Sequence, residues 1–293
     1  MEEIKFVKEI KNNEKYRSGF NELASQIFGI DFEPWYQYGY WTDRYEPYCY
    51  TISNRIVANV SVNKLDLIIN GERKRAIQLG TVMTHPDYRN QGLSASLMKK
   101  IADEYESHYD MFYLFANSTV LDYYPKFGFR AVDEYKWTMN YSRKQTPSRS
   151  LQRLNGRNKD DLDFIYQFAT ERIPCSNKFG TDHTENLLMF YCMYVFPEHI
   201  HYIEEDDTIV IYQGAGDEIH IYDVICKKET DMLKVIDRIT MMETQKVILH
   251  FTPYHCDQES FTREKFYGSE VLFVKTNAVT LPLYFKHPIT SQA

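Results

Sequence analysis

Glycine is scarce in this chain, and cysteine is scattered. The 293 residues include 12 glycines and five cysteines, Cys49, Cys175, Cys192, Cys226 and Cys256. The cysteines are odd in number, and none stands in a Cys-x-x-Cys pair. This spacing argues against a disulfide framework and against a zinc site. The sequence therefore predicts a protein of a reducing compartment that holds no metal.

Long hydrophobic runs are also missing. No apolar stretch is long enough to span a bilayer, and the first residues, "MEEIKFVKEIKNNEKY", are charged where a signal peptide would be apolar. The formal net charge is -7, which disfavours a general nucleic-acid binder. We therefore expect a cytoplasmic protein whose partners are neither nucleic acid nor membrane.

The composition is that of a globular protein, with 43% hydrophobic residues in a length that suits one large domain or two ordinary ones. Residues 141–160 are polar and basic and contain a proline and a glycine, as linkers often do. The predicted organisation is a first domain over 1–142, a linker over 143–160 and a second domain over 161–293.

The first half alternates strand and helix patterns. An amphipathic helix is expected over 15–29, ending at Gly29. Asn70-Gly71 predicts a two-residue hairpin turn, because both positions tolerate positive φ. The apolar residues before this turn change phase, which predicts a bulge near Asn63-Lys64.

Further along, a helix is expected from Leu93 and a buried strand over 111–116. A short helix and a turn follow over 117–129, and 132–141 predicts the strand that closes the first half.

The junction between the second hairpin strand and the helix reads Arg89-Asn90-Gln91-Gly92-Leu93-Ser94. The first N–H groups of a helix lack internal partners, and the helix dipole adds positive charge there, so an anion can bind. Gly92 has no Cβ that would block its approach. The stretch is neither a Walker loop nor a GxGxxG fingerprint. It predicts a diphosphate site.

These residues resemble the cofactor loop of the GCN5-related N-acetyltransferase (GNAT) superfamily, Arg/Gln-x-x-Gly-x-Gly/Ala, with Ser94 in the last small position. The preceding "VMTHP", residues 82–86, is similar to the family's lead-in. Asn117 after the next strand and "YPKFGF", residues 124–129, match two further family features in the right order. The resemblance covers about residues 1–140.

The resemblance implies an α/β (α+β) fold of the GNAT type, with a mixed, mostly antiparallel twisted sheet flanked by helices. It also implies acetyl-coenzyme A as cofactor and direct transfer of the acetyl group to a primary amine of a small molecule or peptide. Tyr124 stands where the family has its general acid. The residues implied in cofactor binding are Val82, Met83, Thr84, Arg89, Asn90, Gln91, Gly92, Leu93, Ser94 and Asn117.

Simpler interpretations of these residues stay open. Arg89 could be an ordinary surface arginine, Tyr124 could only pack, and Asn117 could only cap the next helix. The general base is undecided, because Gln78 stands where many family members have a glutamate. The candidates are a water chain, a group from the second domain, or one of the carboxylates Asp31, Glu33, Asp43 and Glu46.

The stretch 31–48 is rich in aromatic and acidic residues, and in the resembling family this segment shapes the acceptor pocket. Aromatic faces and carboxylates suit a cation, so we expect a cationic amine acceptor. The alternative is that these aromatics belong to the core. The predicted acceptor residues are Glu33, Trp35, Tyr36, Asp43 and Glu46.

The second half repeats the element order of the first. A hairpin about residues 214–216, a helix over 229–244, a strand over 246–253 and a last strand within 266–276 predict a degenerate second GNAT-like copy. "ICKKETDML" replaces the diphosphate loop and contains no glycine. Such tandem chains resemble the Eis-like acetyltransferases; an unrelated α/β domain is the alternative.

Three functional classes follow. The first is an acetyl-coenzyme A-dependent N-acetyltransferase, which could form a homo-oligomer. The second is a non-catalytic acyl-coenzyme A sensor. The third is an aminoacyl-tRNA-dependent peptidyltransferase, which the acidic composition disfavours.

Overall fold

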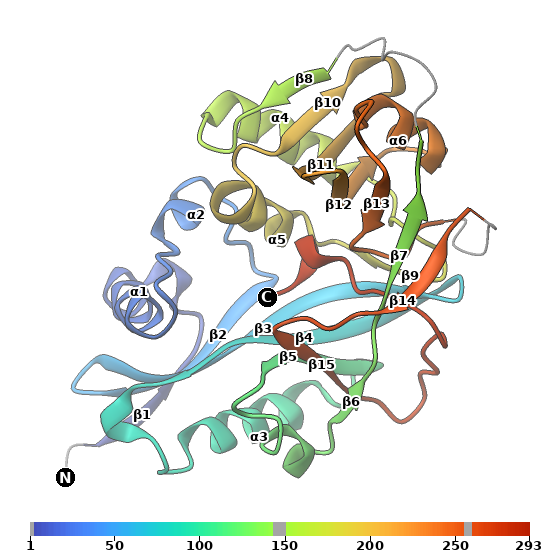
Figure 1. Ribbon diagram of the computed structural model, residues 1–293. Coiled ribbons are helices and arrows are strands. Elements are labelled where there is room, and N and C mark those ends of the chain that lie inside the picture. The colour runs from blue at the N-terminus through green and yellow to red at the C-terminus, as the bar shows by residue number, and fades with distance from the viewer. Residues whose placement is uncertain (1–2, 143–150, 255–259) are drawn as a thin grey trace.

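Two mixed β-sheets form the framework of the molecule (Figure 1). The computed structural model describes residues 3–142, 151–254 and 260–293. Within these residues the first sheet has eight strands and the second has seven. This agrees with the predicted α/β class.

The first sheet has the strand order β1-β2-β3-β4-β5-β15-β6, and β9 pairs with the far end of β3. Neighbouring strands run antiparallel except β4 and β5, which are parallel. The strands are β1 (Ile4–Val7), β2 (Tyr45–Ile52), β3 (Arg55–Ile69), β4 (Glu72–Thr84), β5 (Met111–Asn117), β6 (Arg130–Val132), β9 (Phe179–Asp182) and β15 (Glu270–Lys275).

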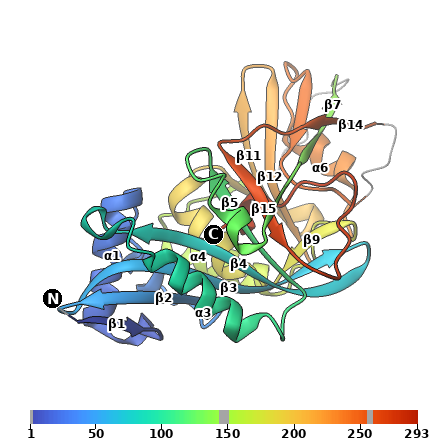
Figure 2. The same ribbon diagram turned by 90° about the horizontal axis from the view of Figure 1, so that it is seen from below.

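Helices cover both faces of this sheet. Helix α3 (Leu93–Tyr105) packs on one face and crosses β2, β3 and β4 (Figure 2). Helices α1 (Glu14–Phe28) and α2 (Glu33–Gln37) pack on the other face. Asn13 caps α1 by accepting a hydrogen bond from the Tyr16 N–H, and Gly29 ends the helix at φ 71°. The predicted helix and its stop are confirmed.

The hairpin at Asn70-Gly71 is confirmed, with positive φ at both residues. The bulge expected near Asn63-Lys64 is wrong, because both residues keep regular register opposite β4. Val60 and Val62 face the core under α3, whereas Leu65 and its odd-numbered neighbours pack into a separate core with Phe179. The apolar phase changes because the strand is buried on opposite faces along its length.

The second sheet repeats this order as β8-β10-β11-β12-β13-β7-β14, again with one parallel pair, β12 and β13. Its strands are β8 (Leu151–Leu154), β10 (Ile200–Ile203), β11 (Thr208–Ala215), β12 (Glu218–Cys226), β13 (Lys246–Leu249), β7 (Tyr135–Asn140) and β14 (Thr262–Lys265). Its helices are α4 (Lys159–Thr170), α5 (Glu185–Phe190), a π-helical turn (Tyr191–Val195) and α6 (Met232–Ile239). The predicted repetition of element order is therefore present in the strand pairing.

The two halves of the chain exchange strands: the first half gives β7 to the second sheet, and the second half gives β9 and β15 to the first sheet. β7 lies in the first half of the sequence but pairs with β13 and β14 of the second sheet. β15 lies in the second half but sits between β5 and β6 of the first sheet. Both strands form where the sequence predicts them, but each belongs to the opposite sheet. The expectation that 132–141 closes the first sheet is therefore wrong.

The linker predicted over residues 143–160 can be compared with the structure only over part of its length. Residues 143–150 lie outside the described residues. Residues 151–154 form β8, which pairs with β10, and α4 begins at Lys159, so these parts belong to the second unit rather than to a linker.

Residues 285–293 pass between the two sheets (Figure 1). The buried Lys286 ammonium donates to the Glu134 carboxylate at 3.0 Å. Further along, the Gln78 side chain donates to the Ser291 carbonyl at 2.8 Å and accepts from the Ala293 N–H at 2.7 Å. The segment thereby connects both units and reaches the centre of the first sheet.

Two features are absent from the residues that the structure describes. No helix there is long and apolar enough to cross a membrane. No group of three or more His, Cys, Asp or Glu side chains is arranged to hold a metal ion.

Candidate functional site

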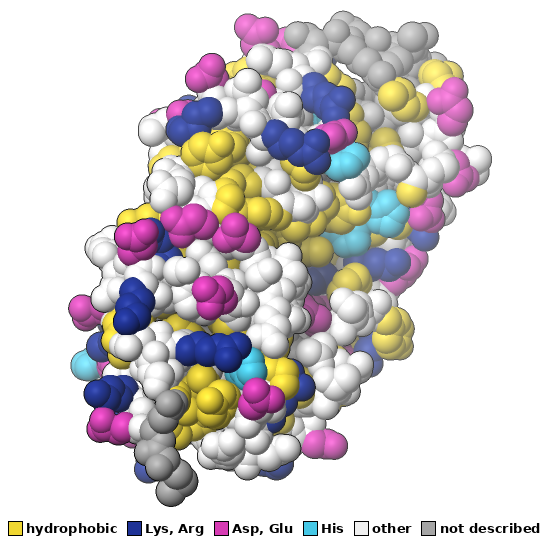
Figure 3. Space-filling model, turned by 90° about the vertical axis from the view of Figure 1, so that its left-hand side faces the viewer, with side chains coloured by type: hydrophobic (Ala, Val, Ile, Leu, Met, Phe, Trp, Pro, Cys, Tyr) yellow, Lys and Arg dark blue, Asp and Glu magenta, His cyan; other side chains and the backbone are white. Residues whose placement is uncertain are grey.

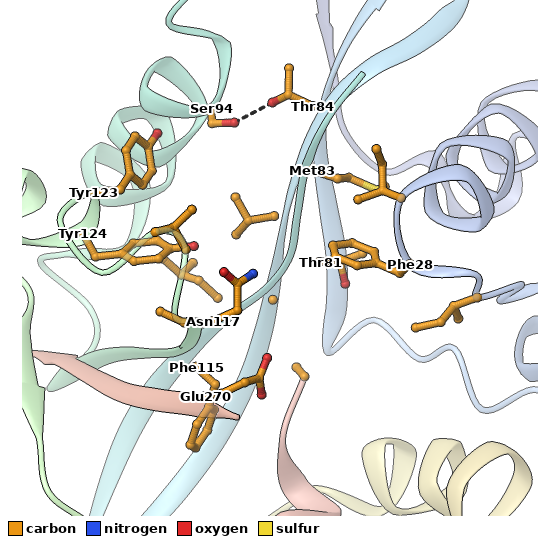
Figure 4. A pocket seen from close by; sticks show the side chains of 18 of the residues that line it. Phe28, Thr81, Met83, Thr84, Ser94, Phe115, Asn117, Tyr123, Tyr124 and Glu270 are labelled. Atoms are coloured by element: carbon orange, nitrogen blue, oxygen red, sulfur yellow. Dashed lines mark hydrogen bonds between the residues drawn. The ribbon is translucent and has the colours of Figure 1, made fainter. Parts of the chain in front are cut away.

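A cavity of about 890 Å³ opens where β4 and β5 separate at their carboxyl ends (Figure 4). On one side it is bounded by the start of α3 and the turn after β5. On the other side it reaches the end of α1 and, from the second unit, helix α5. The cavity therefore joins the region of the predicted cofactor loop to a wall built from both halves of the chain.

A bulge in β4 shapes the cavity floor. The register between β3 and β4 shifts between Asn59 and Ser61, and Thr81 has a positive φ of 49°. The buried Asn59 side chain donates to the Thr81 carbonyl at 2.8 Å, and the Tyr45 and Thr81 hydroxyls are 2.9 Å apart. These bonds hold a conformation that a threonine rarely adopts. The predicted cofactor residues 82–84 follow directly and line the cavity.

The start of α3 has the features expected of an anion site. Gly92, at φ 77°, is the residue before the helix, and no side chain caps the first turn. A Cβ on Gly92 would meet no atom within 4 Å, so the space above the backbone is open. The Ser94 and Thr84 hydroxyls are 2.8 Å apart, and the Arg89 side chain donates to the Thr84 carbonyl at 3.3 Å. These contacts fix the loop against β4 (Figure 4).

Ten of the predicted cofactor and catalytic residues line this cavity together: Val82, Met83, Thr84, Arg89, Asn90, Gly92, Leu93, Ser94, Asn117 and Tyr124. Gln91 is not among the lining residues, and its side chain donates to the Asp87 carbonyl instead. The diphosphate could bind the backbone of this loop without the Gln91 side chain.

Asn117, the last residue of β5, and Tyr124, in the segment that follows, both line the cavity (Figure 4). The Asn117 side-chain oxygen accepts from the Thr119 N–H at 3.0 Å, so this residue also caps the turn. Tyr124 is buried, and its ring packs against Phe129 and Phe273. Burial raises the pKa of the Tyr124 hydroxyl to about 12, with a contribution from the nearby Glu270 charge. The phenol therefore stays protonated at neutral pH and can donate a proton.

Glu270 is a lining residue that the sequence did not single out. It begins β15 and is paired with Asn117 on β5 (Figure 4). Burial raises the pKa of its carboxyl above the ordinary value. Its charge also helps burial to raise the pKa of Tyr191 in the second unit. Glu270 thus lies within electrostatic range of tyrosines on both sides of the cavity. The strand exchange places it there, so no local sequence signal could have found it.

The predicted acceptor residues lie mostly elsewhere. Trp35 lines the cavity, and its indole N–H donates to the Asn186 carbonyl at 2.9 Å. Glu33 pairs with Arg17 at 2.9 Å, Asp43 pairs with Lys11, and Glu46 pairs with Lys64 at 2.8 Å. None of these carboxylates, nor Asp31 or Tyr36, is among the lining residues that the structure describes. They are therefore poor candidates for a base or a cation site in this cavity.

The corresponding place in the second sheet, where α6 begins beside β12, is nearly filled. It holds a cavity of about 20 Å³, lined among others by Cys175, Phe251, Tyr254 and Phe261. A coenzyme cannot enter a space of that size. The second unit therefore has the strand order of the first without an open cleft at this position.

Comparison with known proteins was made by sequence and by structure. The family pattern described as an acetyltransferase (GNAT) domain matches residues 8–132, which contain the loop, the bulge and Tyr124. These residues form a GNAT domain. A search of curated proteins found no match to this chain.

Solved structures with the same arrangement extend the likeness beyond the GNAT domain. A probable N-acyltransferase from Enterococcus faecalis V583 has a TM-score of 0.61 at 14% identity, over 94% of this chain and 73% of its own. A GCN5-related N-acetyltransferase from Kribbella flavida scores 0.58 at 12% identity, over 94% and 71%. Eis1 from Mycobacterium abscessus scores 0.57 at 10% identity, over 94% and 73%. At these identities the likeness concerns the fold, and it includes the second unit.

Proposed function

We propose that the protein is an acetyl-coenzyme A-dependent N-acetyltransferase that acts on a primary amine of a small molecule or peptide. The observation that supports this most directly is the arrangement of the cavity in the GNAT domain. An uncapped helix start, an open backbone at Gly92 and a protonated tyrosine all line one space. We further infer that the second unit is a degenerate copy of the GNAT fold, because its strand order is the same and its cleft is closed.

Different residues of the chain would hold different parts of the coenzyme. The backbone N–H groups of residues 90–94 would hold its diphosphate, with Arg89 at the mouth. The amides after the β4 bulge would bond the pantetheine arm and the thioester carbonyl, where they stabilise developing negative charge. The bound coenzyme supplies the activated acetyl group.

Two side chains would move the protons of the transfer. The amine nitrogen attacks the carbonyl carbon, a C–N bond forms and the C–S bond breaks. Glu270 accepts the proton that the amine must lose, because its carboxylate side chain lines the cavity and its raised pKa brings it nearer to neutral. Tyr124 donates a proton to the departing sulfur. The proton count balances, and no metal is needed.

Calorimetry with coenzyme A on paired glycine variants tests the cofactor site. Gly92→Asp places a carboxylate where the diphosphate would bind, and we expect loss of measurable affinity. Gly71→Asp is the matched control, because Gly71 also has positive φ and no atom within 4 Å of a Cβ, but lies at the β3–β4 turn. Equal affinities in the two variants would refute the site.

Turnover of an amine panel, followed by thiol release, tests the enzymatic role. Tyr124→Phe should lower kcat by about 100-fold or more while the affinity for coenzyme A is unchanged. A wild-type protein that binds coenzyme A and acetylates no amine would contradict catalysis and favour a sensor.

A further inference from the structure

The part of the cavity opposite Tyr124 has an apolar wall. Ile27, Phe28 and Ile30 come from the end of α1 and the residues after it, and Phe190 and Tyr191 come from the second unit. These five side chains are half-buried or exposed, so they keep accessible surface at the cavity. Figure 4 shows Phe28 across the cavity from Tyr124. An acceptor that reaches the thioester from this side must pass between these side chains.

The wall continues onto the outer surface. Tyr194, 38% exposed, stacks near Phe190 with ring centroids 4.8 Å apart, and its hydroxyl donates to the Asp31 carbonyl. Phe28 is 44% exposed. On the face that carries α1 and α5, hydrophobic side chains form a band in the region between the two units (Figure 3). The entrance is therefore apolar as well as the interior.

Charge is sparse on this wall. Among the lining residues that the structure describes, the cationic side chains are Arg89 and Lys126, both on the cofactor side, and the carboxylate side chain is that of Glu270; the last residue, Ala293, also lines the cavity, against Gly80. Glu33, Asp43 and Glu46 are engaged by Arg17, Lys11 and Lys64 outside the cavity. An ammonium group can be paired at Glu270. An ammonium placed against the wall itself would lose water against hydrocarbon and ring carbon without a carboxylate side chain beside it, which is costly.

We propose that the acceptor is a monoamine carried on an aromatic or aliphatic body, with its amino group at Glu270 and its body between Phe28 and Phe190. The inference rests on the proposed function. It places the amino group at Glu270 instead of at the acidic and aromatic stretch 31–48. Burial of the apolar body supplies the affinity, and the Glu270 carboxylate orients the nitrogen toward the thioester.

Measurement of acetyl transfer by the full chain from acetyl-coenzyme A to competing amines tests this inference. We expect kcat/KM for 2-phenylethylamine and hexylamine to exceed that for spermidine and ethanolamine by about tenfold or more, as differences of one apolar group commonly give. A preference for spermidine would overturn the inference and leave the proposed function standing. Coenzyme A binding without turnover of any amine would overturn the proposed function, and the inference with it.

A matched pair of variants tests where the apolar body of the acceptor binds. Phe28→Ala should raise KM for 2-phenylethylamine by about fivefold to tenfold with little change in kcat, and should leave KM for ethylamine within about twofold. Phe164→Ala is the control, because Phe164 is 39% exposed on α4 and is not among the lining residues. Equal effects of the two substitutions, or an equal effect of Phe28→Ala on both amines, would overturn the assignment.

Discussion

Glu270 and Asn117 are paired across the contact between β15 and β5, although they belong to opposite halves of the sequence. Both side chains line the cavity of the GNAT domain. The strand exchange thus does more than connect two sheets. It brings a carboxylate from the second half to the point where β4 and β5 separate, next to the buried Tyr124.

Substitution of Glu270 should lower activity without lowering the stability of the fold. Glu270→Gln removes the proposed proton acceptor, and we expect kcat/KM to fall by about 10²-fold to 10⁴-fold. The wild-type rate should rise with pH through a range above the ordinary carboxyl pKa, because burial raises the pKa of Glu270, and the variant should lack this rise. Initial rates between pH 4.5 and 8 measure both effects.

The same substitution should not lower the stability of the fold, although it lowers activity. A carboxyl whose pKa is raised by folding binds its proton more tightly in the folded state, so ionisation at neutral pH lowers the free energy of unfolding. Glu270→Gln should therefore leave Tm at pH 7 unchanged or higher. Glu22→Gln, on the exposed side of α1, is the control for both measurements. A lower Tm together with lost activity would show that Glu270 is structural.

The hydrogen bonds of the Gln78 side chain show why a glutamate at this position would be unfavourable. Its amide nitrogen donates to the Ser291 carbonyl at 2.8 Å and to the Tyr113 hydroxyl at 3.1 Å, while its oxygen accepts from the Ala293 N–H at 2.7 Å. A carboxylate would accept from Ala293 but would face the Ser291 carbonyl without a proton to donate. We expect Gln78→Glu to lower the free energy of unfolding by about 2 kcal/mol or more at pH 7.

Part of that loss should be recovered in acid. The buried glutamate would have a raised pKa, and its protonated form could again donate to Ser291. Denaturant unfolding of Gln78→Glu relative to the wild type at pH 7 and at pH 5 measures the recovery. A penalty that is the same at both pH values would contradict this role for the amide nitrogen.

The exchange of strands predicts that neither half folds alone. Without β15, residues 1–142 lose the strand between β5 and β6, and the buried Leu272, Phe273 and Val274 no longer cover the sheet. We expect this fragment to aggregate or to unfold without cooperativity, because an apolar sheet edge is left open. Circular dichroism during heating and size-exclusion chromatography measure this.

Co-expression provides the positive control for the fragment. Residues 1–142 produced together with 143–293 should co-purify as a complex that regains coenzyme A binding, since each supplies the other's missing strand. A fragment 1–142 that unfolds cooperatively by itself would show that β15 is dispensable for the first sheet.

The position of the predicted cofactor loop at a helix start was predictable from the sequence because its residues are nearly contiguous. Gly92 and Ser94 lie in the local geometry of that helix start, which a short motif encodes. The hairpin at Asn70-Gly71 was predictable for the same reason. Such features depend on neighbours along the chain, and the sequence carries that information directly.

The acceptor side could not be predicted, because it depends on contacts between distant segments. Trp35, predicted as part of a cation site, and Trp41 of the same aromatic stretch pack against Tyr45 at centroid distances of 5.3 and 5.2 Å and belong to the core under α1. Phe190 and Glu270 come from the second half, and no residue near them in sequence marks them as part of a site. Aromatic and acidic composition alone does not distinguish a core from a pocket.

The reciprocal exchange also bears on how such a chain can change over time. A chain without its second half would have a first sheet with a gap between β5 and β6, so the half with the closed cleft is needed for the integrity of the half with the open one. Because α5 lines the cavity without belonging to the loop at residues 89–94, substitutions on α5 can reshape one wall of the cavity and leave that loop intact.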